Sequence, residues 1–147
     1  MRPSSLAKPL LVLTLAAGII GCGRKGDPLP RPRAATQAAQ TRLLGLRRLE
    51  IILPTQDAKG ASLVGVELIR VLYLPLGLVR PTPEEVFSRG EVVLERRRPD
   101  LPAPGGSLEM DLTTLQRPAG WLVVVPVRLG DVPGRPSDVI PWLDPAL

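Results

Sequence analysis

The sequence predicts an all-β fold, a single antiparallel β-sandwich that follows a signal peptide and a disordered tether. Short apolar runs recur beyond residue 42, and clusters of Pro, Gly and Asp separate them. Several runs alternate apolar with charged residues, most clearly in 108–112, where Glu109 and Asp111 interrupt Leu and Met. Short runs at this spacing with a period of two are typical of antiparallel sandwiches and barrels.

The first 21 residues have the pattern of a secretory signal peptide. Arg2 and Lys8 precede an apolar stretch, residues 10–20, and no acidic residue occurs among the first 21 residues. As a helix this stretch would span roughly 16 Å, about half the core of a bilayer. It is therefore too short for a stable transmembrane anchor and suits a cleaved signal.

The residues that end this segment, Ile19-Ile20-Gly21-Cys22, resemble the lipobox of bacterial lipoproteins. The resemblance implies cleavage between Gly21 and Cys22 and acylation of Cys22, the only cysteine of the chain. Several acyl chains would tether the protein stably. Gly23 follows in place of Asp, which implies an outer-membrane lipoprotein facing the periplasm. An ordinary secretory peptide with an incidental cysteine is the alternative.

Removal of 21 residues from the 147 leaves 126, enough for one domain. With Arg2 and Lys8 removed, 17 basic residues face 14 acidic ones, a net charge of +3. This mild charge does not indicate a nucleic-acid-binding protein. Since Cys22 is committed to lipid, no disulfide is available, and stability has to come from apolar packing.

Residues 22–41 are predicted to form a tether. Prolines at 28, 30 and 32 favour extended backbone. Arg24, Lys25, Arg31 and Arg33 would lie within reach of lipid head groups, where each could contribute about 1 kcal/mol of attraction. A merely soluble spacer explains the same composition.

Residues 42–147 are predicted to form the sandwich. Its apolar runs are 43–53, 63–74, 91–95, 108–112, 121–129 and 139–143. Pro83 followed by Glu84 and Glu85 indicates one helical turn, since proline suits the first helical position and acids suit the positive helix end. We expect Trp121 in the core, whereas Trp142 fits core and surface equally.

Residues 43–143 resemble a fibronectin type III module, an immunoglobulin-like sandwich. The segment 115–121 is similar to the turn into the family's sixth strand, with Trp121 at the position of its corner tyrosine. The resemblance implies that Val123, Val125 and Val127 point inward. Segments 65–70 and 134–139 resemble the third strand and the entry to the last. Pro126 would interrupt the sixth strand, so we expect a bulge or an exposed edge there.

The start of the mature chain, Cys22-Gly23-Arg24-Lys25-Gly26-Asp27-Pro28-Leu29-Pro30, is similar to a second group. Short outer-membrane lipoproteins that begin Cys-Gly-x-Lys-Gly-Pro-Leu assist maturation of the lipopolysaccharide translocon. The match covers about nine residues, with Asp27 inserted.

The residue types argue against an enzyme. The chain has no histidine, which removes the commonest general base and metal ligand, and its only thiol is predicted to be acylated. We expect no catalytic residue, no metal, no cofactor, no small-molecule substrate and no nucleic acid. Arg96, Arg97 and Arg98 form the one charge cluster, which would suit an anionic partner. A solvated strand end is the favoured explanation of these three residues.

These observations lead to the hypothesis of a lipid-anchored envelope protein that acts as a non-enzymatic binding or scaffolding module for an envelope protein. The alternative is an assembly factor for the lipopolysaccharide export machinery of the outer membrane. A carbohydrate-processing accessory module is a third possibility, which would need exposed aromatic residues.

Overall fold

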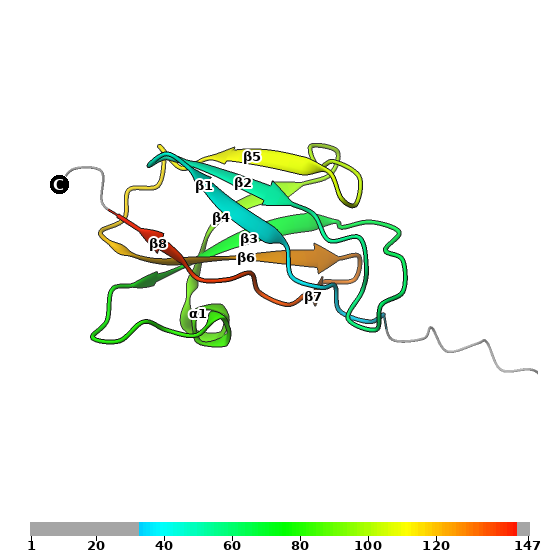
Figure 1. The fold of residues 1–147 in the computed structure, drawn as a ribbon, viewed down its shortest axis with the longest axis horizontal. Helices are drawn as coiled ribbons and strands as arrows, with labels where there is room; N and C mark the ends of the chain where they lie inside the picture. The colour runs from blue at the N-terminus through cyan, green and yellow to red at the C-terminus, as the bar shows by residue number, and fades with distance from the viewer. Residues whose placement is uncertain (1–32, 144–147) are drawn as a thin grey trace, which may run out of the picture. The chain divides into compact units, whose positions relative to one another are not determined.

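Two antiparallel sheets face each other in the computed structural model, which describes residues 33–143 (Figure 1). The three-stranded sheet has the order β1-β2-β5, formed by Gln40–Leu44, Arg48–Ile52 and Ser107–Asp111. The five-stranded sheet has the order β4-β3-β6-β7, and β8 also pairs with β6. Its strands are β3 Leu68–Pro75, β4 Glu91–Arg97, β6 Gly120–Arg128, β7 Val132–Pro133 and β8 Ile140–Trp142. The predicted β-sandwich is confirmed; the finer fibronectin type III resemblance stays a prediction.

The main core lies between the two sheets and is almost entirely aliphatic. Strands β2 and β5 contribute side chains from one sheet, and β3, β6 and β8 contribute them from the other. Its most buried members include Leu49, Ile51, Met110, Ile69, Val71, Tyr73, Leu122, Val124 and Trp142. Burial of each such side chain contributes about 1.5–3 kcal/mol, so this layer supplies the packing that the absence of a disulfide demands. Trp142, which the sequence left open, is a core residue.

Helix α1, Pro83–Arg89, lies beside the five-stranded sheet (Figure 1). A second apolar cluster lies on the face of this sheet opposite the main core and includes Val86 of the helix. The helix begins with a capping box: the Thr82 hydroxyl accepts from the Glu85 amide at 3.2 Å, and the Glu85 carboxylate accepts from the Thr82 amide at 2.8 Å. Pro83 opens the first turn, as the sequence predicts. Val86 is fully buried on the sheet, so the predicted helical turn is confirmed as a short helix.

The orientation predicted for β6 is wrong. Val123, Val125 and Val127 belong to the cluster under α1, and Leu122 and Val124 face the other sheet. Every residue from Leu122 to Val127 is buried, because this central strand is covered on both faces. Alternation therefore could not reveal which face is which.

Pro126 fits β6 without the expected bulge or exposed edge. It lies opposite Ile69 in the continuous β3·β6 register, and it is buried. Its carbonyl oxygen accepts from the Gly134 amide at 2.7 Å, so its ring nitrogen also faces away from β3. On that side β7 pairs only with Val127 and Arg128, and β8 pairs only with residues 120–122. No strand residue therefore lies opposite the Pro126 nitrogen, and no hydrogen bond of the sheet is lost. The irregularity in this sheet lies instead in β3·β4, between Val71 and Leu72.

Two predicted runs differ from the observed strands. The run 43–53 divides into the hairpin β1–β2, which turns at Gly45 with a φ of 73°. This positive φ favours glycine, and the apolar residues around Gly45 hid the turn. In the run 63–74 only the part from Leu68 onward is a strand.

Residues 34–41, predicted as part of the tether, pack on the sandwich. Thr36 is buried and forms a bridge with Asp57, and β1 begins at Gln40. The Arg135 amide donates to the Thr36 carbonyl oxygen at 3.0 Å. The folded domain therefore extends to the first described residues, and the predicted boundary at residue 42 falls inside β1.

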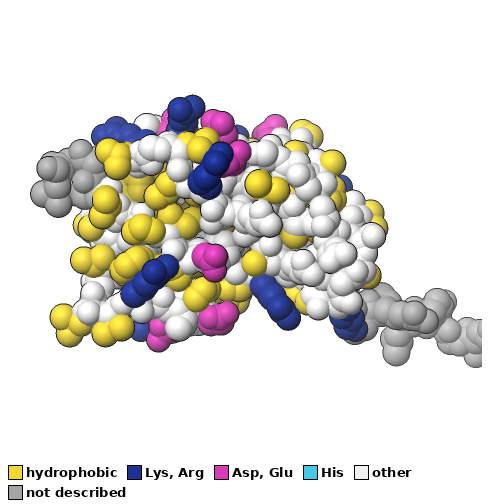
Figure 2. Space-filling model, in the orientation of Figure 1, with side chains coloured by type: hydrophobic (Ala, Val, Ile, Leu, Met, Phe, Trp, Pro, Cys, Tyr) yellow, Lys and Arg dark blue, Asp and Glu magenta, His cyan; other side chains and the backbone are white. Residues whose placement is uncertain are grey.

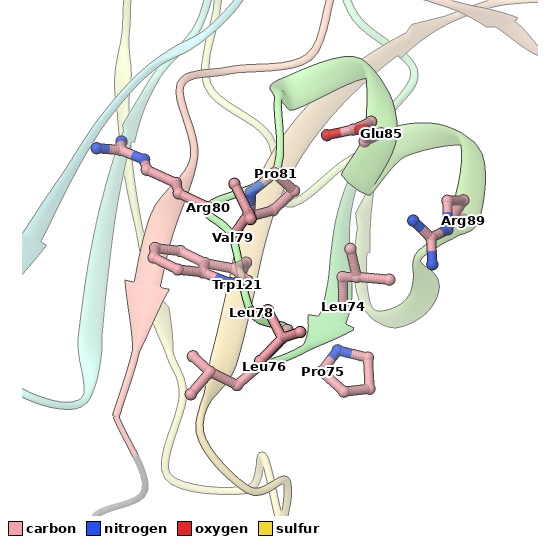
Figure 3. Close-up of a pocket in the computed structure, with 11 residues that line it drawn as sticks. Leu74, Pro75, Leu76, Leu78, Val79, Arg80, Pro81, Glu85, Arg89 and Trp121 are labelled. Atoms are coloured by element: carbon pink, nitrogen blue, oxygen red, sulfur yellow. The ribbon is translucent and has the colours of Figure 1, made fainter.

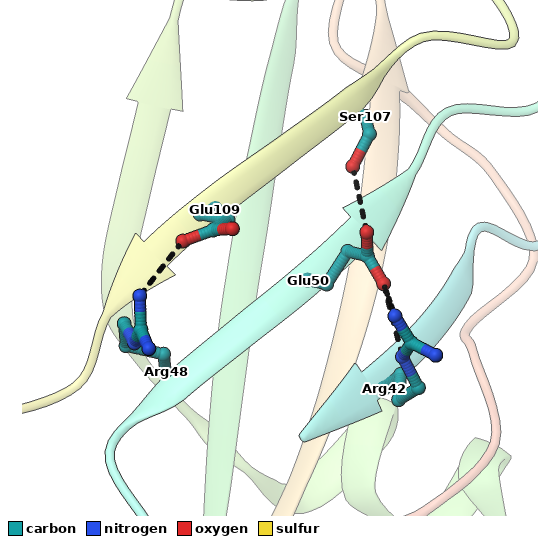
Figure 4. A network of polar contacts seen from close by, with 5 residues as sticks. All are labelled: Arg42, Arg48, Glu50, Ser107 and Glu109. Atoms are coloured by element: carbon teal, nitrogen blue, oxygen red, sulfur yellow. Dashed lines mark hydrogen bonds and ion pairs between the residues drawn. The ribbon is translucent and has the colours of Figure 1, made fainter. Parts of the chain in front are cut away.

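Charged side chains cover the outer face of the three-stranded sheet (Figure 4). Arg42 pairs with Glu50 at 2.9 Å, and Arg48 pairs with Glu109 at 3.5 Å across neighbouring strands. Ser107 also donates to Glu50 at 3.2 Å. Such exposed pairs are worth at most about 1 kcal/mol each, but they leave this face polar and solvated.

Candidate functional site

The residues predicted to carry lipid and cleavage, Cys22 and Gly21, lie outside the described residues. Within residues 33–143 no group of acidic, His or Cys side chains is placed to hold a metal ion. No helix in that same range is long and apolar enough to cross a membrane.

The predicted arginine cluster does not form one surface. Arg96 lies opposite Ile69 on the core side of the edge strand β4, half buried. Arg97 points to the other face and pairs with Glu95 at 3.1 Å. Arg98 lies beyond the strand, and its Nε donates to the Val66 carbonyl oxygen at 2.9 Å. Adjacent strand residues point to opposite faces, so the three guanidinium groups separate.

The most distinctive surface is an apolar loop between β3 and α1, which we call the apolar tip: Leu76, Leu78 and Val79. Their exposed fractions are 60%, 106% and 81%. In Figure 2 hydrophobic side chains gather at the end of the molecule where this loop lies, at the lower left. Single exposed apolar residues are ordinary, whereas a contiguous group marks an interaction surface.

Contacts at both ends of the loop hold the apolar tip in place. At its start the Leu76 amide donates to the Ala119 carbonyl oxygen at 3.2 Å. At its end Arg80 donates to the Val139 carbonyl oxygen at 3.2 Å, and its guanidinium carbon lies 5.9 Å from the centre of the Trp121 ring. Because contacts hold both ends of the loop, we attribute the exposure of its apolar side chains to a defined loop conformation.

A groove of about 540 Å³ runs between the apolar tip and α1 (Figure 3). Trp121 and Leu74 line it from the sheet, and Glu85 and Arg89 line it from the helix. Trp121 is half buried here, at the rim of the cluster under α1, and does not enter the main core. Its indole nitrogen is buried without a hydrogen-bond partner among the described residues. The expectation of a core Trp121 is therefore corrected to a groove-lining one.

The charges around the groove are mostly positive. Arg80 and Arg89 line it, and neither has a carboxylate partner among the ion pairs of residues 33–143. Glu85 also lines it, but its carboxylate accepts from the Thr82 amide. The groove thus combines apolar walls with two arginines that have no carboxylate partner among the described residues. This combination suits an apolar segment that carries acidic residues.

A corner of the chain that lies against the loop is fixed by two aromatic donors. The Tyr73 hydroxyl donates to the Pro118 carbonyl oxygen at 3.2 Å, and the Trp142 indole donates to that of Arg117 at 2.9 Å. Burial raises the pKa of the Tyr73 hydroxyl, so it remains a donor at neutral pH. The sequence analysis placed Trp121 at the position of a corner tyrosine. In the structure Tyr73 of β3 and Trp142 of β8 make the hydrogen bonds to this corner instead.

The sequence predicts none of the residues that form the apolar tip. Leu76, Leu78 and Val79 have the composition of a buried run. The available signal is the spacing of Pro75, Gly77 and Pro81, because turn residues this close together indicate that the strand ends and a loop follows. Apolar residues between them have to sit on a loop.

Comparison of the chain with protein family models, with curated proteins and with solved structures finds no match. The candidate site therefore rests on its geometry alone.

Proposed function

We propose that this chain is a lipid-anchored envelope protein whose fibronectin type III-like sandwich is a non-enzymatic module for binding or scaffolding another envelope protein. The apolar tip and its groove are the docking site. The observation that carries this is the fixed exposure of Leu76, Leu78 and Val79 beside a groove of about 540 Å³. An apolar anchor group within a polar rim is the usual anatomy of a protein-binding hot spot.

The anchoring part of the proposal rests on Cys22. Its test is metabolic labelling of the producing bacterium with an alkyne fatty acid. We expect label on the full chain and none on the Cys22→Ser variant. Equal labelling of both chains, or none of either, would contradict anchoring through this residue.

The docking part is tested by site-specific photocrosslinking in native membranes. A photoreactive amino acid replaces Leu78, and a matched control replaces Glu109, which is exposed on the charged face of the three-stranded sheet. We expect a discrete adduct from position 78, lost in the Leu76→Ser background, and none from position 109. Identical adducts from both positions would sink the idea of a docking tip.

The assembly factor for lipopolysaccharide export is the second candidate, and it is favoured by the segment 22–30. Deletion of residues 34–147 separates the two functions. The cut falls at residue 33 because 34–41 belong to the folded domain. Export that persists with the truncated chain supports the assembly role, and export that is lost supports a role of the sandwich.

A further inference from the structure

A second surface lies at the opposite end of β6 from the apolar tip. It surrounds a pocket of about 290 Å³. We call it the arginine end, and its side chains are Arg33, Arg98, Arg128, Val64, Leu129 and Glu67. Strand β6 has nine residues from Gly120 to Arg128. At about 3.3 Å per residue, the two surfaces lie roughly 26 Å apart along the strand.

Three arginines from distant parts of the chain meet there, each held by a main-chain carbonyl oxygen. Arg33 donates to Leu129 at 3.2 Å, and Arg128 donates to Ala34 at 2.6 Å. Arg98 donates to Val66 at 2.9 Å. A guanidinium group has five N–H donors, so each keeps donors free for a ligand.

The arginine end carries a net positive charge. No carboxylate pairs with Arg33, Arg98 or Arg128 in the part of the chain that the structure describes. Glu67 is the one acid that lines the pocket, which leaves a local charge of +2. Arginine forks match the geometry of phosphate oxygens.

Two exposed apolar side chains lie among these arginines. Val64 is 92% exposed and Leu129 is 57% exposed. Apolar side chains flanked by basic ones are typical of surfaces that lie on a membrane, where the apolar groups enter the interface and the cations meet the phosphates.

The chain toward Cys22 also leaves the domain here, since Arg33 lines the pocket. Eleven residues, 22–32, separate Arg33 from the start of the predicted mature chain. Fully extended, they reach at most about 40 Å. An acylated Cys22 would therefore keep the arginine end near the membrane surface.

We propose that the arginine end lies on the phosphate-bearing head groups of the membrane that holds the anchor, so that the apolar tip points away toward its partner. This orientation rests on the proposed lipid anchor. It assigns the two ends of the sandwich to different partners: lipid phosphates at one and a protein at the other.

Vesicle binding of an anchor-free chain tests the proposal. The chain from residue 22 onward with Cys22→Ser contains every residue of both hydrophobic clusters. Its binding is measured by flotation with phosphatidylcholine vesicles, with and without phosphatidylglycerol. We expect binding only to the anionic vesicles, weakened by salt. A chain without this preference would overturn the proposal.

Two charge-matched triple variants locate the contact. Arg33→Gln/Arg98→Gln/Arg128→Gln should lower the partition into anionic vesicles about a hundredfold, at roughly fivefold per arginine. The control, Arg42→Gln/Arg47→Gln/Arg48→Gln, removes the same charge from the β1–β2 hairpin and should change it by less than about fivefold. Thermal unfolding checks that both variants fold. Equal losses in the two variants would overturn the proposal, because net charge would then explain the binding.

The Cys22→Ser chain has no other cysteine, so a single dye reports orientation directly. An environment-sensitive fluorophore is attached in the Val64→Cys variant and, for comparison, in the Leu78→Cys variant. On anionic vesicles the first should shift to the blue and the second should not; the opposite pattern would place the apolar tip on the membrane and overturn the proposal. Because these chains lack the anchor, failure here leaves the Cys22 labelling result untouched.

Discussion

The two ends of β6 present opposite surfaces and are held together by different kinds of side chain. At the Gly120 end the apolar tip is exposed, and buried aromatic donors, Tyr73 and Trp142, fix the adjacent corner. At the Arg128 end, Arg33 and Arg128 donate hydrogen bonds to main-chain carbonyl oxygens near the surface. A surface that exposes apolar groups needs a rigid support beneath it, whereas a charged surface remains solvated without one.

This difference leads to a simple expectation about energies. Disturbing the support of the apolar tip should cost folding stability, because buried groups are displaced. Disturbing the arginine end should cost little stability and should show instead in membrane binding. The following variants test each side of that contrast.

The largest effect is expected for Gly120→Ala. A Cβ at this position would overlap the Tyr73 ring and the Leu74 carbonyl oxygen, neither of which can move away cheaply. We expect a loss of about 3 kcal/mol in the free energy of unfolding, measured by urea denaturation. Gly77→Ala is the matched control, because its new Cβ would find no atom nearer than 3.9 Å. Equal stability of the two variants would show that the corner is not rigid.

A smaller loss is expected for Trp142→Phe, about 1.5 kcal/mol. The change removes the indole donor to the Arg117 carbonyl oxygen and leaves a small void in the main core. Urea denaturation measures the loss.

Tyr73→Phe removes the neighbouring hydrogen bond to the Pro118 carbonyl oxygen and should lower the free energy of unfolding by about 1 kcal/mol. If the two donors fix one corner, their effects in the double variant should depart from additivity by at least about 0.5 kcal/mol. Strict additivity would mean that the two bonds act independently.

Sequence patterning could predict the β-sandwich, strand β5 and helix α1, but not every strand boundary and not the surfaces. The alternation in 108–112 and the proline and acids at 83–85 correspond to β5 and α1 as expected. Both are local signals, since a period of two and a helix start are written in consecutive residues.

The rest depends on contacts between distant residues. Strand β6 is apolar on both faces, so no pattern could assign its sides. The three arginines of the arginine end lie at positions 33, 98 and 128, and only the fold brings them together. The run 96–98 attracted attention because it is contiguous, yet a strand sends its neighbours to opposite faces.

Arg70→Gln, which breaks an ion-pair network near the arginine end, should lower the free energy of unfolding by about 1 kcal/mol at neutral pH. Arg70 contacts Glu95 at 2.9 Å and Asp131 at 3.0 Å. The hydrogen bond from Arg70, and next that from Arg97, lowers the pKa of Glu95. A lowered folded-state pKa stabilises the fold above the unfolded value of about 4.3 and loses that stabilisation as the pH falls through the folded value.

The difference in unfolding free energy between the parent and Arg70→Gln should therefore shrink as the pH is lowered from 6 to about 3. Urea denaturation across this pH range measures it. The Glu95→Gln background serves as the control, because the part of the pH dependence that belongs to Glu95 should be gone there. A difference that stays constant with pH would show that Glu95 titrates without help from Arg70.

The smallest effect on stability, and the sharpest contrast with Gly120, is expected for Gly65→Ala. A Cβ at Gly65 would overlap the guanidinium group of Arg98, which is the free end of a flexible side chain. The arginine can swing away if it exchanges its hydrogen bond to the Val66 carbonyl oxygen for one to water. The free energy of unfolding should then fall by no more than about 0.5 kcal/mol, the low end of the net contribution of a hydrogen bond. Displacement of Arg98 should still weaken binding to anionic vesicles about as much as Arg98→Gln does, roughly fivefold. Glycine-to-alanine changes at Gly120, where β6 begins, and at Gly65, which lines the pocket at the arginine end, would then separate the two roles. A large loss of stability from Gly65→Ala, or unchanged vesicle binding, would mean that the position of Arg98 does not define the arginine end.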